Sequence, residues 1–274
     1  MTDVTFIIQG PYYSDHLRMI MELKQHGKVI LSCYISDYEK ITSPHLYDSI
    51  ILNDFPNCEG IYNYRNVYHQ VRTTLRAVKH VETEYVVKFR GNAYFSNIKY
   101  IVDLIHTNPQ KLTISPFHIN PVWPYQLSDH IIGGTTKTIQ SMFECANQMI
   151  LQKDFIYGGV DSRLCAEVMM YIAFLKSKNH TFGKSLFDYY LTGDPIADGR
   201  FMYTDGNIVV NVSDDYIDTI INNIEIIDSK KLEPFLNKSN TDSRLNITSS
   251  SQVKYNTINS YIHAFIDTYK EYIT

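Results

Sequence analysis

The chain has 274 residues, 44% of them hydrophobic and 20% charged, with a formal net charge of −4. This composition fits a soluble globular protein with a sizeable core and excludes disorder over most of the length. The slightly acidic balance provides no positive field for a nucleic-acid backbone, so no nucleic-acid partner is expected.

We expect neither a secretory leader nor a transmembrane segment. The N-terminal residues lack the charged, apolar and small-residue regions of a signal peptide, and no apolar run approaches the roughly 18 residues of a membrane span. The four cysteines are widely spaced and match no zinc pattern, which predicts free thiols and a cytoplasmic location. They are Cys33, Cys58, Cys145 and Cys165.

The chain opens with a predicted strand, helix and strand. An apolar strand at residues 5–9 ends in a Gln-Gly-Pro turn, and Ser14 is positioned to cap the following helix. Gly27 is expected to end that helix in a left-handed conformation, before a second strand at residues 29–34. A unit of this length is typical of a right-handed parallel crossover.

The same alternation continues to about residue 115. Further strands are predicted at residues 49–52, 84–89 and 111–115, and helices at residues 67–78 and from a capping Ser96 to residue 105. This pattern predicts an α/β domain with a mainly parallel central sheet flanked by helices, and ligands bind such sheets at the carboxyl ends of the strands.

Helices are predicted next at about residues 135–151 and 161–175. After about residue 179 the pattern weakens, with a strand predicted at 207–212, a polar exposed segment at 237–252 and a last amphipathic helix at 258–269. We therefore expect residues 1–180 to form the main α/β domain and residues 181–274 an α/β extension that packs on it.

Two segments carry polar side chains in an unusual arrangement. Residues 66–70 read Asn-Val-Tyr-His-Gln at the start of a helix, and residues 88–92 read Lys-Phe-Arg-Gly-Asn at the end of a strand. Together with the first turn, they resemble the WavE lipopolysaccharide-synthesis family. The resemblance implies a nucleotide-sugar-dependent glycosyltransferase with the GT-A fold.

The resemblance assigns donor-binding roles at the strand ends and on the helix. The residues expected to bind the donor are Gln9, Gly10, Pro11, Asp37, Asn66, His69, Gln70, Arg90 and Asn92. All of these except Asn92 have a structural alternative. The Gln-Gly-Pro segment forms an ordinary turn, Asp37 is a solvated side chain, the polar stripe at 66–73 is the solvent-facing side of a helix, or Arg90 is a surface arginine paired with a carboxylate.

The chain departs from the family pattern at two positions. His69 stands where the family has Arg, and imidazole is only partly charged near neutral pH. Asn92 replaces the expected Asp, so a Mn²⁺ or Mg²⁺ site is weakened or missing. Three explanations remain open: Asp129 or Asp54 completes the metal site, Arg90 and other cations replace the metal, or the protein has lost turnover.

Two carboxylates are candidates for the general base. Asp129 is the first choice. It belongs to a Ser-Asp-His block that resembles one following the acceptor-side strand in related transferases, and it is also the candidate metal ligand beside Asn92. The alternative role of Asp129 is to cap a turn. Glu167 is the second choice, and nearby Asp161 is a helix cap. Trp123 and Tyr125 stack on a sugar or belong to the core.

The implied reaction moves a hexose or deoxyhexose from a nucleoside diphosphate sugar to a hydroxyl of a growing glycan or lipid-linked saccharide. The alternative is a catalytically inactive module that binds sugar nucleotides or scaffolds glycan assembly. The substitution at Asn92 is the feature that favours this alternative.

Overall fold

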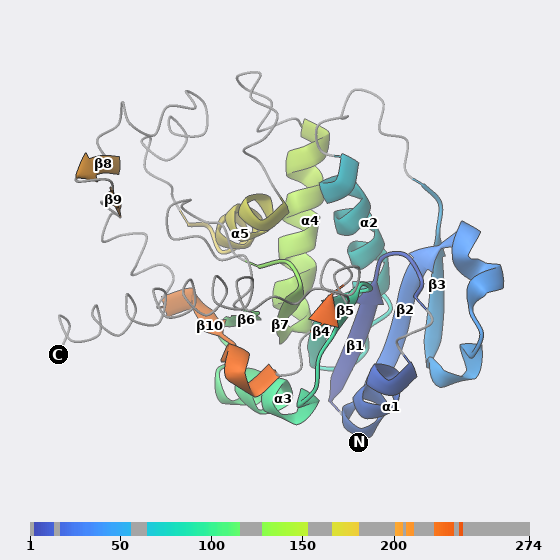
Figure 1. Cartoon of the computed structure of the whole chain (residues 1–274). Coiled ribbons are helices and arrows are strands. Elements are labelled where there is room, and N and C mark those ends of the chain that lie inside the picture. The colour runs from blue at the N-terminus through green and yellow to red at the C-terminus, as the bar shows by residue number, and fades with distance from the viewer. Residues whose placement is uncertain are drawn as a thin grey trace.

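The computed structural model (Figure 1) describes most of the first two thirds of the chain and short segments beyond them. The described residues are 3–13, 17–55, 65–115, 128–152, 166–180, 201–204, 207–210, 222–232 and 236–237. Within them, no helix is long and apolar enough to cross a membrane. The sequence predictions for residues 116–127, 161–165 and 238–274 lie outside the described part of the chain.

A seven-stranded sheet forms the centre of the described structure, in the order β10-β6-β7-β4-β1-β2-β3. Its strands are β1 (Val4–Gln9), β2 (Lys28–Tyr34), β3 (Ser49–Asn53), β4 (Tyr85–Arg90), β6 (Leu112–Ile114), β7 (Ile131–Thr135) and β10 (Ile224–Ile226). Strand β7 runs antiparallel to both of its neighbours, and the other pairs are parallel. The predicted α/β class with a mainly parallel sheet is confirmed.

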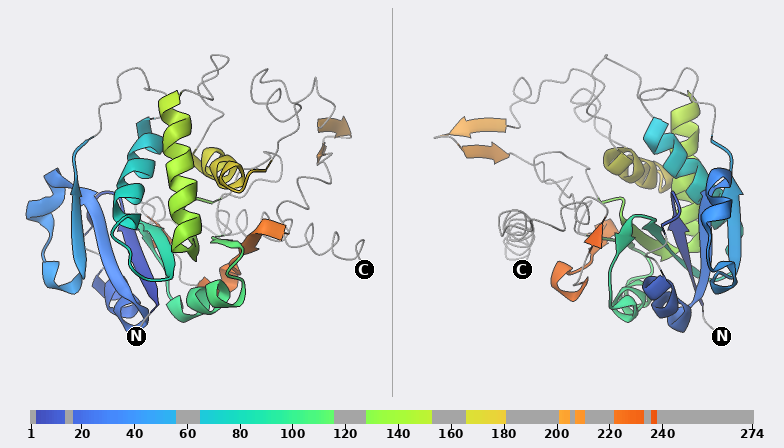
Figure 2. Two further views of the ribbon diagram at one scale, coloured as in Figure 1. Left: turned by 180° about the vertical axis from the view of Figure 1, so that it is seen from behind. Right: turned by 45° about the vertical axis from the view of Figure 1, so that its right-hand side comes forward.

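Helices cover both faces of this sheet (Figures 1 and 2). Helices α1 (Leu17–His26) and α3 (Ile98–Thr107) pack on one face; α2 (Arg65–Val78), α4 (Thr136–Gln152) and α5 (Ala166–Ser177) pack on the other. Because side chains alternate along a strand, Phe6 and Ile8 of β1 belong to the first core and Ile7 to the second. The apolar runs in the sequence reflect strands that are buried on both faces.

The direction of the chain through the sheet changes at β1. The chain passes from β1 to β2 and β3 on one side, and then α2 returns it to β4 on the other side of β1. Gln9 and Arg90, the last residues of β1 and β4, are register partners. Open α/β sheets bind ligands outside the strand ends at such a switch point. The two predicted turns therefore meet at the edge where a ligand is expected.

Two predicted helix boundaries have causes that differ from the expected ones. Gly27 does not adopt a left-handed conformation; a Cβ there would lie 2.3 Å from the Val4 carbonyl oxygen, so the position requires close backbone approach. The expected Ser96 cap is wrong, because the N-cap of α3 is Asn97, which makes no side-chain capping bond. Glu22 of α1 instead accepts a hydrogen bond from Ile98 N at 3.1 Å.

The block at residues 128–130 leads directly into strand β7. Its relation to an acceptor-side strand stays a prediction. The antiparallel strand itself was not predicted, because its Gly133-Gly134 pair lowers the apparent strand tendency. At Gly133, a Cβ would lie 2.7 Å from Ile105 Cδ1, so the pair allows α3 to approach the sheet closely.

The remaining described elements are small. Strand β5 (Ala93–Tyr94) pairs antiparallel with β11 (Leu236–Asn237), and β8 (Phe201–Thr204) pairs antiparallel with β9 (Asn207–Val210). Short 3₁₀ helices occupy Ile35–Lys40, Pro44–Leu46 and Ser229–Leu232. Strand β10 adds a segment from beyond residue 180 to the central sheet, and the division of the chain at residue 180 stays a prediction.

Candidate functional site

Polar side chains gather on the face of the sheet beneath α2, close to the carboxyl ends of the strands. Gln9 Nε2 donates to Thr73 Oγ1 of α2 at 3.0 Å, and Ser32 Oγ donates to the Thr73 carbonyl at 2.8 Å. Asn53 Nδ2, at the end of β3, donates to Ser32 Oγ at 3.0 Å. All four residues are buried. The ends of three neighbouring parallel strands therefore present hydrogen-bonding groups to one helix.

The polar stripe of α2 faces this cluster. His69, Gln70 and Thr73 are 8%, 8% and 1% exposed, so the alternative that the stripe is the wet side of the helix is wrong. The solvent side carries Arg72 and Arg76. Asn66 lies in the first turn of α2, but its side chain is outside the described part of the structure. The stripe is buried because the strand ends below it are themselves polar.

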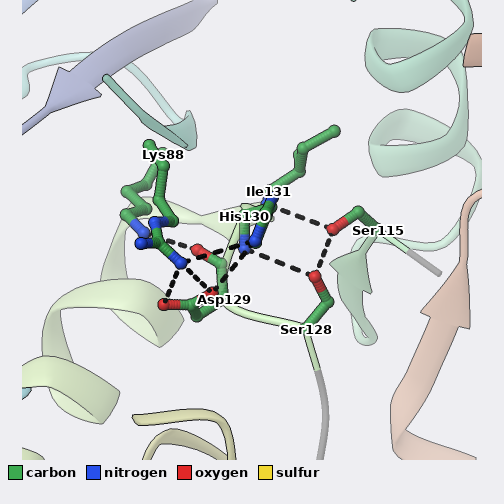
Figure 3. A network of polar contacts seen from close by, with 7 residues as sticks. Lys88, Ser115, Ser128, Asp129, His130 and Ile131 are labelled. Atoms are coloured by element: carbon green, nitrogen blue, oxygen red, sulfur yellow. Dashed lines mark hydrogen bonds and ion pairs between the residues drawn. The ribbon is translucent and has the colours of Figure 1, made fainter. Parts of the chain in front are cut away.

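Two cationic side chains, two residues apart on β4, lie on the same face of the sheet. Figure 3 shows Lys88 beside Asp129. Lys88 is completely buried, and its Nζ donates to the backbone carbonyl of Asp129 at 2.5 Å. Arg90 Nη1 lies 3.2 Å and 3.4 Å from the two carboxylate oxygens of Asp129. The carboxylate is 3% exposed and the Arg90 side chain 37%. Arg90 therefore has the carboxylate partner of the structural alternative, while part of its side chain remains accessible.

A pair of serines fixes the segment that carries Asp129 (Figure 3). Ser115 Oγ and Ser128 Oγ are 2.6 Å apart. Ser128 Oγ accepts from His130 N and Ser115 Oγ accepts from Ile131 N, each at 3.3 Å. His130 Nε2 lies 3.4 Å from Arg90 Nη1. This network holds Asp129 and His130 against the end of β4.

The charges in this cluster shift one another's protonation. Burial lowers the pKa of Lys88 from 10.5 to about 7, although the negative charges of Asp129 and Glu167 oppose the shift. Burial would raise the pKa of Asp129, but Lys88, Arg90 and His130 outweigh it, so this pKa lies below its ordinary value. At neutral pH Asp129 is therefore ionised, and Lys88 loses its proton far more readily than an exposed lysine.

Gln70 and Glu167 lie beside the same cluster. The Gln70 side chain helps to lower the pKa of Asp129, although its Nε2 makes no hydrogen bond of standard geometry to a described residue. Glu167 is in the first turn of α5, and its negative charge raises the pKa of Lys88. The structure thus brings together four predicted site residues from four separate segments of the chain. They are Gln70, Arg90, Asp129 and Glu167.

The first turn is locked in place by neighbours on both sides. Asp37 is buried, accepts a hydrogen bond from Tyr12 N at 3.2 Å and pairs with Lys40 at 2.7 Å, so its interpretation as a solvated side chain is wrong. Gly10 has a φ of 120°, which favours glycine. Gly91 N donates to the Gln9 carbonyl at 2.6 Å. The turn after β1 and the turn after β4 are therefore built as one unit.

His69 packs against two aromatic rings, although it aligns with an arginine in the family that the sequence resembles. Its ring packs edge-on against Tyr34 and Phe55, at centroid distances of 5.9 Å and 5.4 Å. Tyr34 and Phe55 stack with centroids 4.3 Å apart and an interplanar angle of 5°. Local sequence patterns do not indicate this aromatic group, because its members come from β2, the residue pair after β3, and α2.

The described residues do not fit a divalent metal ion. No three His, Cys, Asp or Glu side chains among them gather closely enough to hold one. Asp129 already faces two cations, which disfavours a third, and Asp54 is exposed after β3. Asn92 is half-buried in the turn after β4 and supplies no charge. Metal ligation by Asn92 and Asp129 stays a prediction, and no step below depends on it.

Lys88 is the functional candidate that the sequence analysis passed over. The sequence feature that could have revealed it is a lysine inside an otherwise apolar strand, at a position where the alternation of side chains along the strand predicts burial. Cys33 and Cys145 are thiols outside any disulfide, as expected. The predicted roles of Trp123, Tyr125 and Asp161 lie outside the described residues.

Fold and site define an α/β protein with a buried charge cluster at the switch point of a mostly parallel sheet. No known protein-family model matches the chain, and a search of curated proteins finds no significant match.

Proposed function

We propose that this protein is a nucleotide-sugar-dependent glycosyltransferase of the GT-A type. It transfers a hexose or deoxyhexose from a nucleoside diphosphate sugar to a hydroxyl of a growing glycan or lipid-linked saccharide. One observation carries the proposal: Lys88 and Arg90 lie on one strand at the switch point of the sheet, beside the buried carboxylate of Asp129. The resemblance of residues 66–70 and 88–92 to the WavE family supplies the substrate class.

Arg90 binds the donor diphosphate. A guanidinium matches phosphate oxygens with two parallel hydrogen bonds, and the partly exposed Arg90 side chain is the cation of the pair that a ligand can reach. When Arg90 turns to the diphosphate, Lys88 remains beside Asp129 and keeps that carboxylate compensated. The site therefore exchanges one anionic partner of Arg90 for another without leaving a buried charge alone.

Transfer breaks the bond between the anomeric carbon and the diphosphate oxygen and forms a bond from that carbon to the acceptor oxygen. The acceptor proton goes to a carboxylate, and the nucleoside diphosphate leaves with the additional negative charge, which Arg90 offsets. While Arg90 is paired with it, Asp129 is a weak base because its pKa is lowered. Release of Arg90 to the donor raises the basicity of Asp129, so donor binding prepares the base; Glu167 is the second candidate.

A binding module without turnover is the second candidate function. Asn92 favours it, because an amide replaces the acid that the resemblance leads one to expect after β4. The two functions differ in one measurable product. A transferase releases nucleoside diphosphate from at least one sugar nucleotide when acceptor is present, and a module releases none.

The test is donor binding to the full chain and to two arginine variants. Thermal shift against UDP-, GDP-, CDP- and dTDP-sugars, with and without Mn²⁺, selects the donor. Arg90→Ala is expected to weaken its binding at least about tenfold by calorimetry, as loss of one charge-assisted contact does. Arg76→Ala, which removes an exposed arginine at the end of α2, is the matched control. Unchanged donor affinity in folded Arg90→Ala contradicts the proposal.

A further inference from the structure

A pair of stacked aromatic rings stands at the ends of β2 and β3. Tyr34, the last residue of β2, is 7% exposed, whereas Phe55, two residues after β3, is 60% exposed. Their rings are nearly parallel at 4.3 Å. Tyr34 covers one face of Phe55, and the exposure of Phe55 leaves the other face accessible.

A third ring contacts both members of the pair. His69 of α2 meets both with its ring at 79° to Tyr34 and 75° to Phe55, which is the favoured edge-on arrangement. A large exposed side chain normally loses rotamer freedom when it binds a ligand. Because Tyr34 and His69 already restrict Phe55, this cost is reduced in advance, which is the advantage of a preorganised contact.

The aromatic pair lies close to the charge cluster. His69 contacts the rings, and the next residue of α2, Gln70, lies beside Asp129. Strands β1 and β2 separate β3 from β4, so the end of β3, which Phe55 follows, is about 14 Å from the end of β4 at the usual strand spacing. An extended nucleoside diphosphate, together with the length of the Arg90 side chain, spans this separation.

We propose that the accessible face of Phe55 stacks against the base of a nucleoside diphosphate whose phosphates reach Arg90. This inference rests on the proposed function and adds the position of the base. A flat apolar ring with a free face binds any nucleobase by stacking, whereas hydrogen bonds select among the bases. The position differs from the assignment in the sequence analysis, where the first turn and Asp37 contact the base and ribose.

The buried state of Asp37 supports this position. Its carboxylate already accepts from Tyr12 N and Lys40, and it is 4% exposed. Asp37 therefore serves to hold the first turn against the 3₁₀ helix Ile35–Lys40. The aromatic pair is an accessible planar surface at the described strand ends near the charge cluster.

The test uses three substitutions at Phe55 in the full chain, with the nucleoside diphosphate that stabilises the wild-type protein most in the thermal-shift panel. Loss of one base–aromatic stack weakens binding about 5- to 150-fold. Phe55→Ala is expected to fall in that range. Phe55→Leu, which keeps an apolar side chain without a ring, is also expected to weaken binding, and Phe55→Trp to retain it.

Phe55→Trp also provides a direct reporter. A base stacked on indole quenches its fluorescence, and the wild-type chain has a single tryptophan, Trp123, as background. We expect quenching by the nucleoside diphosphate in Phe55→Trp beyond that of the wild type, and none by pyrophosphate or the free monosaccharide. Quenching by the monosaccharide alone places the sugar on Phe55 and overturns the inference.

Two further outcomes separate this inference from the proposed function. If Phe55→Ala binds the nucleoside diphosphate as the wild type does while Arg90→Ala does not, the proposed function stands and the base position is wrong. If no nucleoside diphosphate binds the wild-type protein at any concentration up to about 10 mM, where even millimolar affinity is detected, both proposals fail. Circular dichroism of each variant confirms that the fold is intact.

Discussion

Replacing Lys88 by methionine is expected to stabilise the protein at neutral pH and to change how its stability depends on pH. The side chain is completely buried on β4, and burial lowers its pKa from 10.5 to about 7. Between these two values the unfolded chain binds a proton that the folded protein has lost. Stability therefore rises with pH across this window.

The magnitude follows from the size of the shift. A difference of one pKa unit corresponds to about 1.4 kcal/mol, so Lys88 lowers the free energy of unfolding by about 4 kcal/mol near pH 7 and about 2 kcal/mol near pH 9. Methionine removes this penalty, but the Asp129 carbonyl loses its donor, which costs about 1–3 kcal/mol. The net gain is about 2 kcal/mol near pH 7 and about zero near pH 9.

The assay is urea unfolding of the wild type and Lys88→Met at about pH 7, 8 and 9 under reducing conditions, with Lys79→Met as the control because Lys79 is exposed after α2. The quantity compared is the difference between variant and wild type, since other groups in the chain also titrate in this range. Parallel pH profiles of wild type and Lys88→Met would refute the reasoning, because they would show that Lys88 is charged in the folded state throughout.

Two more substitutions test the packing of the site. Asp129→Asn leaves Lys88 and Arg90 without their buried counter-charge, so urea unfolding is expected to show a loss of about 3 kcal/mol. The double variant with Lys88→Met is expected to be more stable than the sum of the two single effects, and a double variant equal to that sum would contradict the coupling. Gly91→Ala places a Cβ 2.9 Å from the Pro11 carbonyl oxygen and is expected to cost about 1–3 kcal/mol, whereas Gly134→Ala, with its nearest atom at 3.6 Å, is the tolerated control. Equal melting temperatures for the two glycine variants would count against the interlocked turns.

The strands and helices of the first half followed from local patterns. Apolar runs at residues 5–9, 29–34 and 84–89 became β1, β2 and β4, because strands buried on both faces are continuously hydrophobic. The apolar spacing from Val67 to Val78 became α2. Convergence of the first and fourth strand ends was also foreseeable, since parallel strands of one sheet expose their carboxyl ends at one edge.

Features that depend on distant contacts were not accessible in this way. The antiparallel strand β7 is defined by its pairing with β4 and β6, and the start of α3 is capped by Glu22 of α1. A cap or a ladder partner from another element leaves no trace in the local pattern. Most of the predicted strands and helices of the first half are therefore present, while the structure differs from the predictions in where some of them begin and in the added antiparallel strand β7.

For the candidate site, the sequence alone identified two polar residues at strand ends, Gln9 and Arg90, and a polar stripe on the helix that became α2. Only the tertiary structure decided their partners. It buried Asp37 and Asp129, turned His69 to an aromatic pair, and gave Lys88 a partner 41 residues away. The physical reason is that the protonation and reach of a side chain depend on the dielectric and the charges around it, and these come from segments that meet only when the chain folds.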